Sequence, residues 1–443
     1  MRISSKITIR TLKKNVVSVA IIVLLAFIAV AITSGIGTLA PQLGARVDAL
    51  YVIQNYVPSH VTDLTNSINA VSYIFPVFFV GVTILVVYIS ISRLIDIERA
   101  QMGCLRSLGF STKKIVGKYL IFTGIASGMG AILGMVLGYF ILSPILFEII
   151  GNHFERLFYG IPPTPSPFPW FGVGVTLITI IFSLGITLLL ILKTNSGAAA
   201  NLLRPKAPIG TKRIKARKEL PNGKNKEDIV VVKESDAYQS IQTCSCRTLK
   251  EEKEKRKGLP FRYKATARNL IRYKSRLFLT VFSMLFSTAL VFVSIALSFV
   301  LGAYNPDDVA FIRPISAVLA IFSVSLCILV IYNITNINIE ERRREIATLK
   351  VLGYRNLEVT GYIFREIFIL GLLGIAVGLP AGFGFMVFLI QNMAFGSVAY
   401  ISRAWYVFLI TAAVTITGLF LTDLLLFRKI IKTDMLGSLK AVE

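Results

Sequence analysis

Charged residues are scarce in this sequence of 443 residues. Asp, Glu, Lys and Arg make up 16% of it, whereas an ordinary soluble domain carries about 25%. Apolar residues reach 54%, and the mean hydropathy is +0.70. So few charges and so much apolar surface exclude an ordinary soluble protein, because the excess apolar surface needs lipid.

Cysteine and histidine are also rare, with four and two residues. The cysteines are Cys104, Cys244, Cys246 and Cys327. None falls in a predicted external loop, so no disulfide framework is expected. The pair Cys244 and Cys246 could bind a metal or a lipid, but a lone CxC without further ligands favours an inert role. The only histidines, His60 and His153, lie far apart and form no HExxH motif. The sequence therefore predicts no metal site and no catalytic residues, which argues against an intramembrane enzyme.

Long apolar runs are what the sequence has instead. A bilayer core of about 30 Å requires roughly 20 apolar residues for each spanning helix. Eight such runs lie near 16–36, 70–92, 116–149, 170–192, 277–302, 312–337, 360–391 and 404–427. They predict an all-α polytopic membrane protein with eight transmembrane helices, joined outside the membrane by loops near 37–69 and 303–311.

The distribution of basic residues predicts the orientation. With the N-terminus in the cytoplasm, only Arg46, Arg156, Arg313 and Arg403 of the 48 Lys and Arg residues lie in or beside external loops. This asymmetry satisfies the positive-inside rule and places both termini in the cytoplasm. The net charge of +24 follows from that topology, and no basic patch interleaved with aromatic residues accompanies it. Nucleic acid is therefore not an expected partner.

The chain repeats itself at a shift of 244 residues. Leu105 to Phe110 then falls on Leu349 to Tyr354, and Arg99 falls on Arg343. The pattern predicts two parallel tandem repeats of four helices, at 1–204 and 263–443. Between them, the segment 205–262 is crowded with Lys, Arg, Glu, Pro and Gly, and we expect a largely disordered cytoplasmic linker.

Glycine ladders recur in the third span of each repeat. They are Gly130, Gly134 and Gly138, and Gly374, Gly378 and Gly382. Glycine at every fourth position lets helix backbones approach closely in lipid. We expect these residues to pack helices together rather than to bind a ligand.

A short amphipathic helix is predicted after the second span of each repeat. Met102, Leu105 and Leu108 form an apolar stripe in the first copy, and Ile346, Leu349 and Leu352 form one in the second. Glycine ends each helix, at Gly109 and Gly353. Such a helix could lie at the lipid headgroups, but its recurrence in both halves favours docking to a pseudo-symmetric partner.

Longer motifs around these helices carry a family resemblance. They are Tyr332 to Arg342 with Arg344 to Gly353, Asp434 to Lys440, Leu203 to Pro208, and Ala267 to Lys274. On them the chain resembles the permease subunits of ABC transporters of the FtsX/MacB type. In that family the loop between the second and third spans of each unit docks on the nucleotide-binding subunit. The resemblance assigns this role to 98–114 and 342–358, with the following residues as the contacts: Glu98, Arg99, Leu105, Leu108, Gly109, Arg343, Glu345, Leu349, Leu352 and Gly353.

The resemblance also implies the partners. The sequence contains no GxxxxGK[ST] loop to hold phosphates, so ATP and Mg²⁺ are expected on a separate ATPase subunit, in two copies for each permease. The implied function is ATP-driven export or extraction of a substrate across a bacterial plasma membrane. An alternative is signalling to a cell-wall hydrolase, as relatives of FtsX do, and a second alternative is an ion-coupled exporter.

Two features bear on the substrate. Most relatives carry a large folded domain between the first and second spans, which the short loop near 37–69 cannot form, so an extracytoplasmic binding protein or a hydrolase could supply that part. Asp423 is the one acid clearly within a span. A buried acid is a candidate functional site, but a local ion pair, with Arg428 five residues on, is the simpler interpretation.

Overall fold

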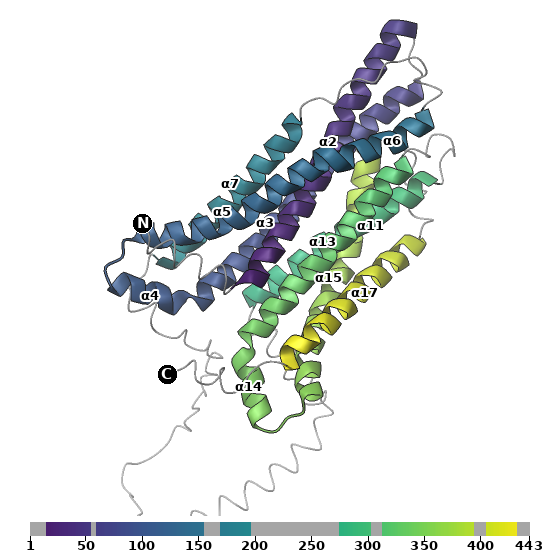
Figure 1. Ribbon diagram of the computed structural model, residues 1–443. Coiled ribbons are helices and arrows are strands. Elements are labelled where there is room, and N and C mark those ends of the chain that lie inside the picture. The colour runs from purple at the N-terminus through teal and green to yellow at the C-terminus, as the bar shows by residue number, and fades with distance from the viewer. Residues whose placement is uncertain are drawn as a thin grey trace, which may run out of the picture. The chain divides into compact units, whose positions relative to one another are not determined.

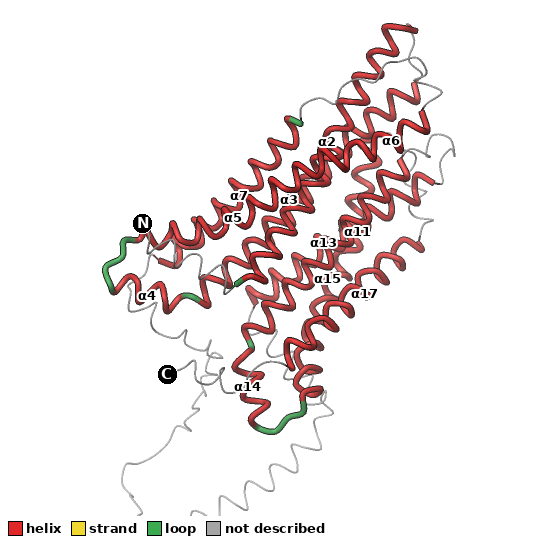
Figure 2. Tube along the Cα trace, viewed as in Figure 1, coloured by secondary structure: helices red, strands yellow, loops and turns green. Residues whose placement is uncertain are grey.

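The computed structural model describes residues 15–54, 59–154, 169–195, 274–302, 312–393 and 405–431. These residues are almost entirely helical, and no strand occurs among them (Figure 2). The predicted linker at 205–262, with Cys244 and Cys246, lies outside the described residues.

The helices of the first half occupy the purple-to-teal part of Figure 1. In chain order they are α2 (Val16–Gln54), α3 (Ser59–Ile97), α4 (Arg99–Ser107), α5 (Thr112–Leu137), the π-helical turn η1 (Gly138–Leu142), α6 (Ser143–Phe154) and α7 (Trp170–Asn195). The helices of the second half are α11 (Lys274–Gly302), α13 (Ile312–Glu341), α14 (Arg343–Val351), α15 (Asn356–Met393) and α17 (Trp405–Ile431).

Eight stretches of the described residues are long and apolar enough to cross a bilayer. They are Val16–Ala49, Val71–Ile97, Thr112–Ile149, Trp170–Thr194, Leu277–Phe299, Pro314–Glu341, Leu357–Gln391 and Trp405–Lys429. The predicted class, an all-α polytopic membrane protein with eight spans, is therefore confirmed. Each half contributes four of the spans, and the third span of the first half runs from α5 through η1 into α6.

The predicted loop near 37–69 is wrong for most of its length. Helix α2 continues to Gln54, and α3 begins at Ser59. The extension is helical because it has something to pack against: Leu39, Ala40 and Leu43 are buried at helical spacing, with 0%, 4% and 3% of their surface exposed. Helices α2 and α3 therefore extend beyond the predicted apolar runs at 16–36 and 70–92.

One buried apolar cluster is shared by the two halves. It includes Leu25 and Ile32 of α2, Phe79 of α3, Phe292 of α11 and Leu326 of α13. Smaller clusters lie within each half, around Tyr119 in the first and around Ile363 in the second. The halves thus pack through the middle of their spans, while each half holds its own short helix, α4 or α14, through a separate cluster.

Candidate functional site

The short helices α4 and α14 lie at the same end of the helical bundle (Figure 1). Each has nine residues. Each follows a long helix after a single bent residue: Glu98 has φ −90° and ψ 8°, and Arg342 has φ −95° and ψ 11°. The bent residue accepts the first hydrogen bond of each short helix, because Met102 N donates to Glu98 O at 3.0 Å and Ile346 N donates to Arg342 O at 2.8 Å.

Both short helices end in the same left-handed turn. Gly109 has φ +83° and Gly353 has φ +87°, values that residues with a Cβ rarely adopt. In each turn the next residue bonds back to the helix, with Phe110 N donating to Leu105 O at 3.1 Å and Tyr354 N donating to Leu349 O at 3.2 Å. This is the usual glycine stop of a helix. It sends the chain directly into α5 or α15.

The apolar stripe of each short helix is divided between the core and the solvent. Met102 and Ile346 are buried, each with 1% of its surface exposed, and Leu105 and Leu349 are half-buried against the clusters of their own halves. The last residue of each stripe is exposed instead, Leu108 at 74% and Leu352 at 73%. Of the predicted contact residues in the stripes, these two leucines are the ones that present a large apolar surface to a partner.

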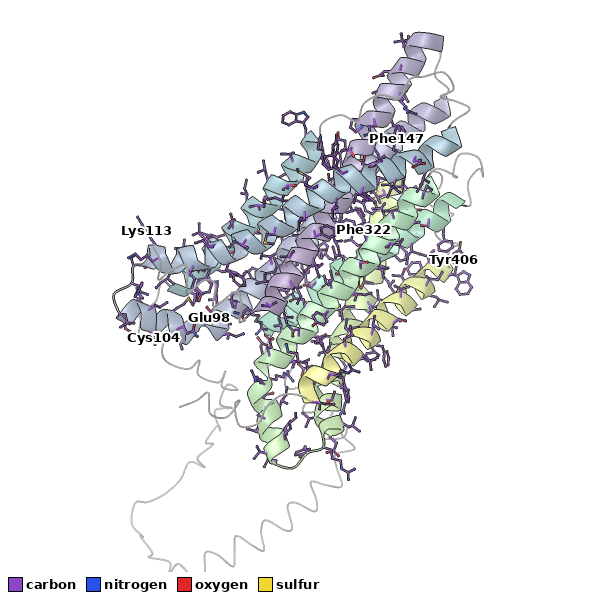
Figure 3. The ribbon with its side chains drawn as sticks, viewed as in Figure 1. Glu98, Cys104, Lys113, Phe147, Phe322 and Tyr406 are labelled. Atoms are coloured by element: carbon purple, nitrogen blue, oxygen red, sulfur yellow. The ribbon has the colours of Figure 1, made fainter. Side chains whose placement is uncertain are left out.

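The predicted polar contact residues also differ in their exposure to solvent. Arg343 and Glu345 are exposed and Arg99 is half-buried, so all three can be reached. Glu98 is 2% exposed and lies inside the bundle, whereas Cys104 lies on the outer side of α4 (Figure 3). Glu98 is therefore out of reach of a partner. The reason is the buried ion pair that it forms.

Glu98 forms a buried ion pair with the third span. Lys118 Nζ and Tyr119 Oη, both on α5, each donate to Glu98 Oε2 at 2.8 Å. Lys118 is 5% exposed and Tyr119 is 1% exposed. A buried charge is costly unless it is paired and hydrogen-bonded, and here the carboxylate has both a cation and a hydroxyl donor. The start of α4 is thereby fixed to α5.

The second half makes a similar link with the acid and the base exchanged, although the third-span residues, Lys118 and Glu366, do not correspond to each other at the shift of 244. At the shift of 244 residues Glu98 corresponds to Arg342, and Arg342 Nη2 donates to Glu366 Oε1 of α15 at 2.5 Å. Both side chains are 7% exposed. Each short helix is therefore joined at its first turn to the third span of its own half, by an acid in one half and a base in the other. Sequence reasoning missed both pairs, although ionisable residues inside two third spans, Lys118 and Glu366, were a signal.

Polar contacts join the two halves close to this end. Arg93 of α3 pairs with Glu341 of α13, and Asn333 Nδ2 donates to Ser90 Oγ at 3.0 Å. Beside them is a cavity of about 30 Å³, room for about one water. Its lining includes Ser92, Thr280 and Asn338. Polar groups within a membrane are a sign of function, and these lie a few residues before each short helix begins.

The glycine ladders face the first span of their own half. A Cβ built at Gly134 would lie 2.6 Å from the carbonyl oxygen of Phe27 on α2, and one built at Gly378 would lie 2.8 Å from Thr288 Cβ on α11. The other four ladder residues are equally crowded: Gly130 and Gly138 meet backbone carbonyls of α2, and Gly374 and Gly382 meet Met284 and Phe292 of α11. No side chain fits at these positions unless the neighbouring helix moves.

Leucine in a ladder should therefore destabilise the protein. We expect Gly134→Leu and Gly378→Leu to lower the free energy of unfolding by at least about 1–3 kcal/mol, the usual cost of overpacking. The matched control is Gly384→Leu, because a Cβ at this exposed glycine of α15 meets nothing within 4 Å. Thermal unfolding and the yield of monodisperse protein in detergent measure the effect. Equal midpoints for the three variants would contradict close packing at the ladders.

In the part of the chain that the structure describes, no three His, Cys, Asp or Glu side chains come close enough together to hold an ion.

Asp423 does not form the expected ion pair with Arg428, because residues five apart face different sides of a helix. Its Oδ1 is buried without a hydrogen-bond partner.

Eight spans, two short helices at one end and buried polar contacts beside them define a polytopic membrane protein. The family model described as FtsX-like permease C-terminal matches residues 73–196 and 317–435. The chain therefore belongs to the FtsX-like permease family, and a segment of each half matches it. Neither a search of curated proteins nor a search of solved structures finds a match.

Proposed function

We propose that this chain is the membrane subunit of an ABC-type system and that it transmits ATP-driven movement through α4 and α14. The observation that carries the proposal is the exposed leucine at the end of each short helix. Leu108 and Leu352 are 74% and 73% exposed, they lie 244 residues apart in sequence, and each falls within one of the two segments that match the family. A repeated apolar contact suits a partner that is itself a symmetric dimer.

The partner is an ATPase subunit present in two copies, one on each short helix. ATP and Mg²⁺ bind to that subunit, and this chain binds neither. In this arrangement α4, α14 and both termini face the cytoplasm, as the distribution of basic residues predicts. Movement of the ATPase dimer would shift the short helices, and the buried pairs Glu98–Lys118 and Arg342–Glu366 would pass the shift to α5 and α15.

The work performed is export or extraction of a substrate, or mechanical signalling, at a bacterial plasma membrane. The polar contacts between the halves at Arg93, Glu341, Ser90 and Asn333 lie where movement of α4 relative to α14 would separate them. A partner on the outer side, a binding protein or a cell-wall hydrolase, would decide between transport and signalling.

Reconstitution tests this proposal. The purified chain alone should hydrolyse no ATP. Co-expressed with the ATP-binding protein encoded beside it, the chain should purify in a ratio of one permease to two ATPase subunits, with ATP turnover that depends on the ATPase. Robust turnover by the single chain would contradict the proposal, and so would failure to associate with any ATP-binding subunit of its gene cluster.

A further inference from the structure

A groove of about 400 Å³ lies between α5 and α7. Its lining is entirely apolar: Leu120, Ile121, Gly124, Leu184, Gly185 and Leu188. Two glycines keep it open, because a Cβ built at Gly185 meets nothing within 4 Å and one built at Gly124 meets only Leu184 Cδ2, at 3.5 Å. The volume is within the range of ligand sites, about 300–1,000 Å³.

The groove is held in shape and faces the bilayer. Just beyond it, Thr187 Oγ1 of α7 donates to Thr123 Oγ1 of α5 at 3.0 Å, which fixes the two helices against each other. Exposed apolar side chains surround it, with Ile121 at 50%, Ile181 at 63% and Leu189 at 68% exposure. Both helices are membrane spans. The groove therefore opens to lipid, and an acyl chain can enter it.

Basic residues lie at the end of the groove nearest α4. Lys113 precedes Leu120 by seven residues, about 10 Å along the helix axis, and it shares a helical face with Gly117, Ile121 and Gly124. Lys113, Lys114 and, at the end of α7, Lys193 are exposed. Figure 3 shows the Lys113 side chain directed away from the bundle at the start of α5. Lysines one to two turns beyond an apolar groove lie at headgroup depth, where they attract anionic lipids.

The second half lacks both features at the matching positions. At the shift of 244 residues Gly124 corresponds to Phe368, whose ring meets that of Phe420 on α17 edge-on at 6.1 Å between centroids. Two aromatic rings therefore stand where the first half has an open groove. Lys113 and Lys114 correspond to Leu357 and Glu358, which removes the positive charge at the start of α15. Lys193 has a counterpart in Lys429, but that lysine is paired with Glu340.

At the matching positions the second half has neither an open groove nor basic counterparts of Lys113 and Lys114. From this difference, and from the lysines at the end of the groove, we propose that the α5–α7 groove binds one anionic phospholipid. Its acyl chain lies against Gly124 and Gly185, and its phosphate is held by Lys113 and Lys114, with Lys193 adjacent. The lipid belongs to the leaflet on the α4 side. The proposal does not depend on the function proposed above or on which side of the membrane α4 faces.

Photolabelling tests the site in the full chain. The probe is phosphatidylglycerol carrying a diazirine in one acyl chain, added at a few per cent to phosphatidylcholine vesicles that contain the purified protein. Mass spectrometry of the peptides should find at least tenfold more label on 116–128 and 181–192 than on 360–372. Excess unlabelled phosphatidylglycerol should compete, and excess phosphatidylcholine should not.

Paired variants separate the groove from the lysines. Gly124→Phe should abolish the label on both peptides, whereas Gly384→Phe, at an exposed glycine outside the groove, should leave it unchanged. The double change Lys113→Ala and Lys114→Ala should reduce the label about 25-fold, at about fivefold for each lysine. The change Lys113→Arg with Lys114→Arg should retain it. Should Gly124→Phe fail to fold, the lysine variants still decide.

Two results would overturn the proposal. Equal labelling of both halves would mean that the groove selects nothing. Equal labelling by a diazirine phosphatidylcholine probe would mean that the lysines do not recognise the headgroup, and that the groove only touches bulk lipid.

Discussion

Arg342→Met should lower the free energy of unfolding by about 3–5 kcal/mol, because it leaves Glu366 buried without its cation. Both side chains of the pair are 7% exposed, so water cannot replace the guanidinium. The loss should appear as a lower midpoint in thermal or denaturant unfolding of the detergent-solubilised chain. The double variant Arg342→Met with Glu366→Met should recover most of the loss, since a buried ion pair can be replaced by apolar residues at little cost.

The neighbouring arginine is the matched control for this prediction. Arg343 is exposed, so Arg343→Met should change the free energy of unfolding by no more than about 0.5 kcal/mol. If Arg342→Met and Arg343→Met had the same midpoint, the pair with Glu366 would contribute nothing. The link between α14 and α15 would then depend on apolar packing alone.

Leu108→Asp and Leu352→Asp should each weaken association with the proposed ATPase subunit at least tenfold without lowering the stability of the chain. The leucines are exposed in the free chain, so a carboxylate there is harmless until a partner buries it. Burial of an unpaired charge is costly, and a loss of about 1.4 kcal/mol already corresponds to tenfold in affinity. Co-purification and the ATP turnover of the reconstituted complex measure the effect.

The two changes together should be worse than either alone, because in the proposed complex both sites act on one ATPase dimer. Lys224→Asp, in the predicted linker, is the control and should leave binding unchanged. Charges at Leu105 or Leu349 would be a poorer test, because these side chains pack against the core of their own half and the fold itself would suffer. Wild-type binding and turnover in both Leu108→Asp and Leu352→Asp would mean that the short helices are membrane-surface elements.

The spans could be predicted from the sequence because a run of about 20 apolar residues has few alternatives to crossing a bilayer. The loop near 37–69 could not, since its helical part depends on Leu39 and Leu43 packing against the other helices. The short helices were predicted from their apolar spacing, which is a local property. Which leucine of the stripe is exposed is not local, because it depends on how α4 lies against α5.

Glu98 shows the same limit at a single residue. Its sequence position, at the start of a charged helix, indicated a surface contact. Its burial depends on Lys118 and Tyr119, 20 and 21 residues further on, and that proximity exists only once α4 has turned back onto α5. An ion pair across a turn of this length cannot be read from spacing, whereas the glycine ladders can, because their period is that of a single helix.

The exchanged charges of the two buried pairs restrict how this duplicated chain can be recombined. A chimera that moves only the α14 segment into the first half would place Arg342 against Lys118, two cations in a site with little access to water. Moving the short helix together with its third span would preserve the pairing. Modular engineering of this chain should therefore cut outside the segment that joins the second span to the third.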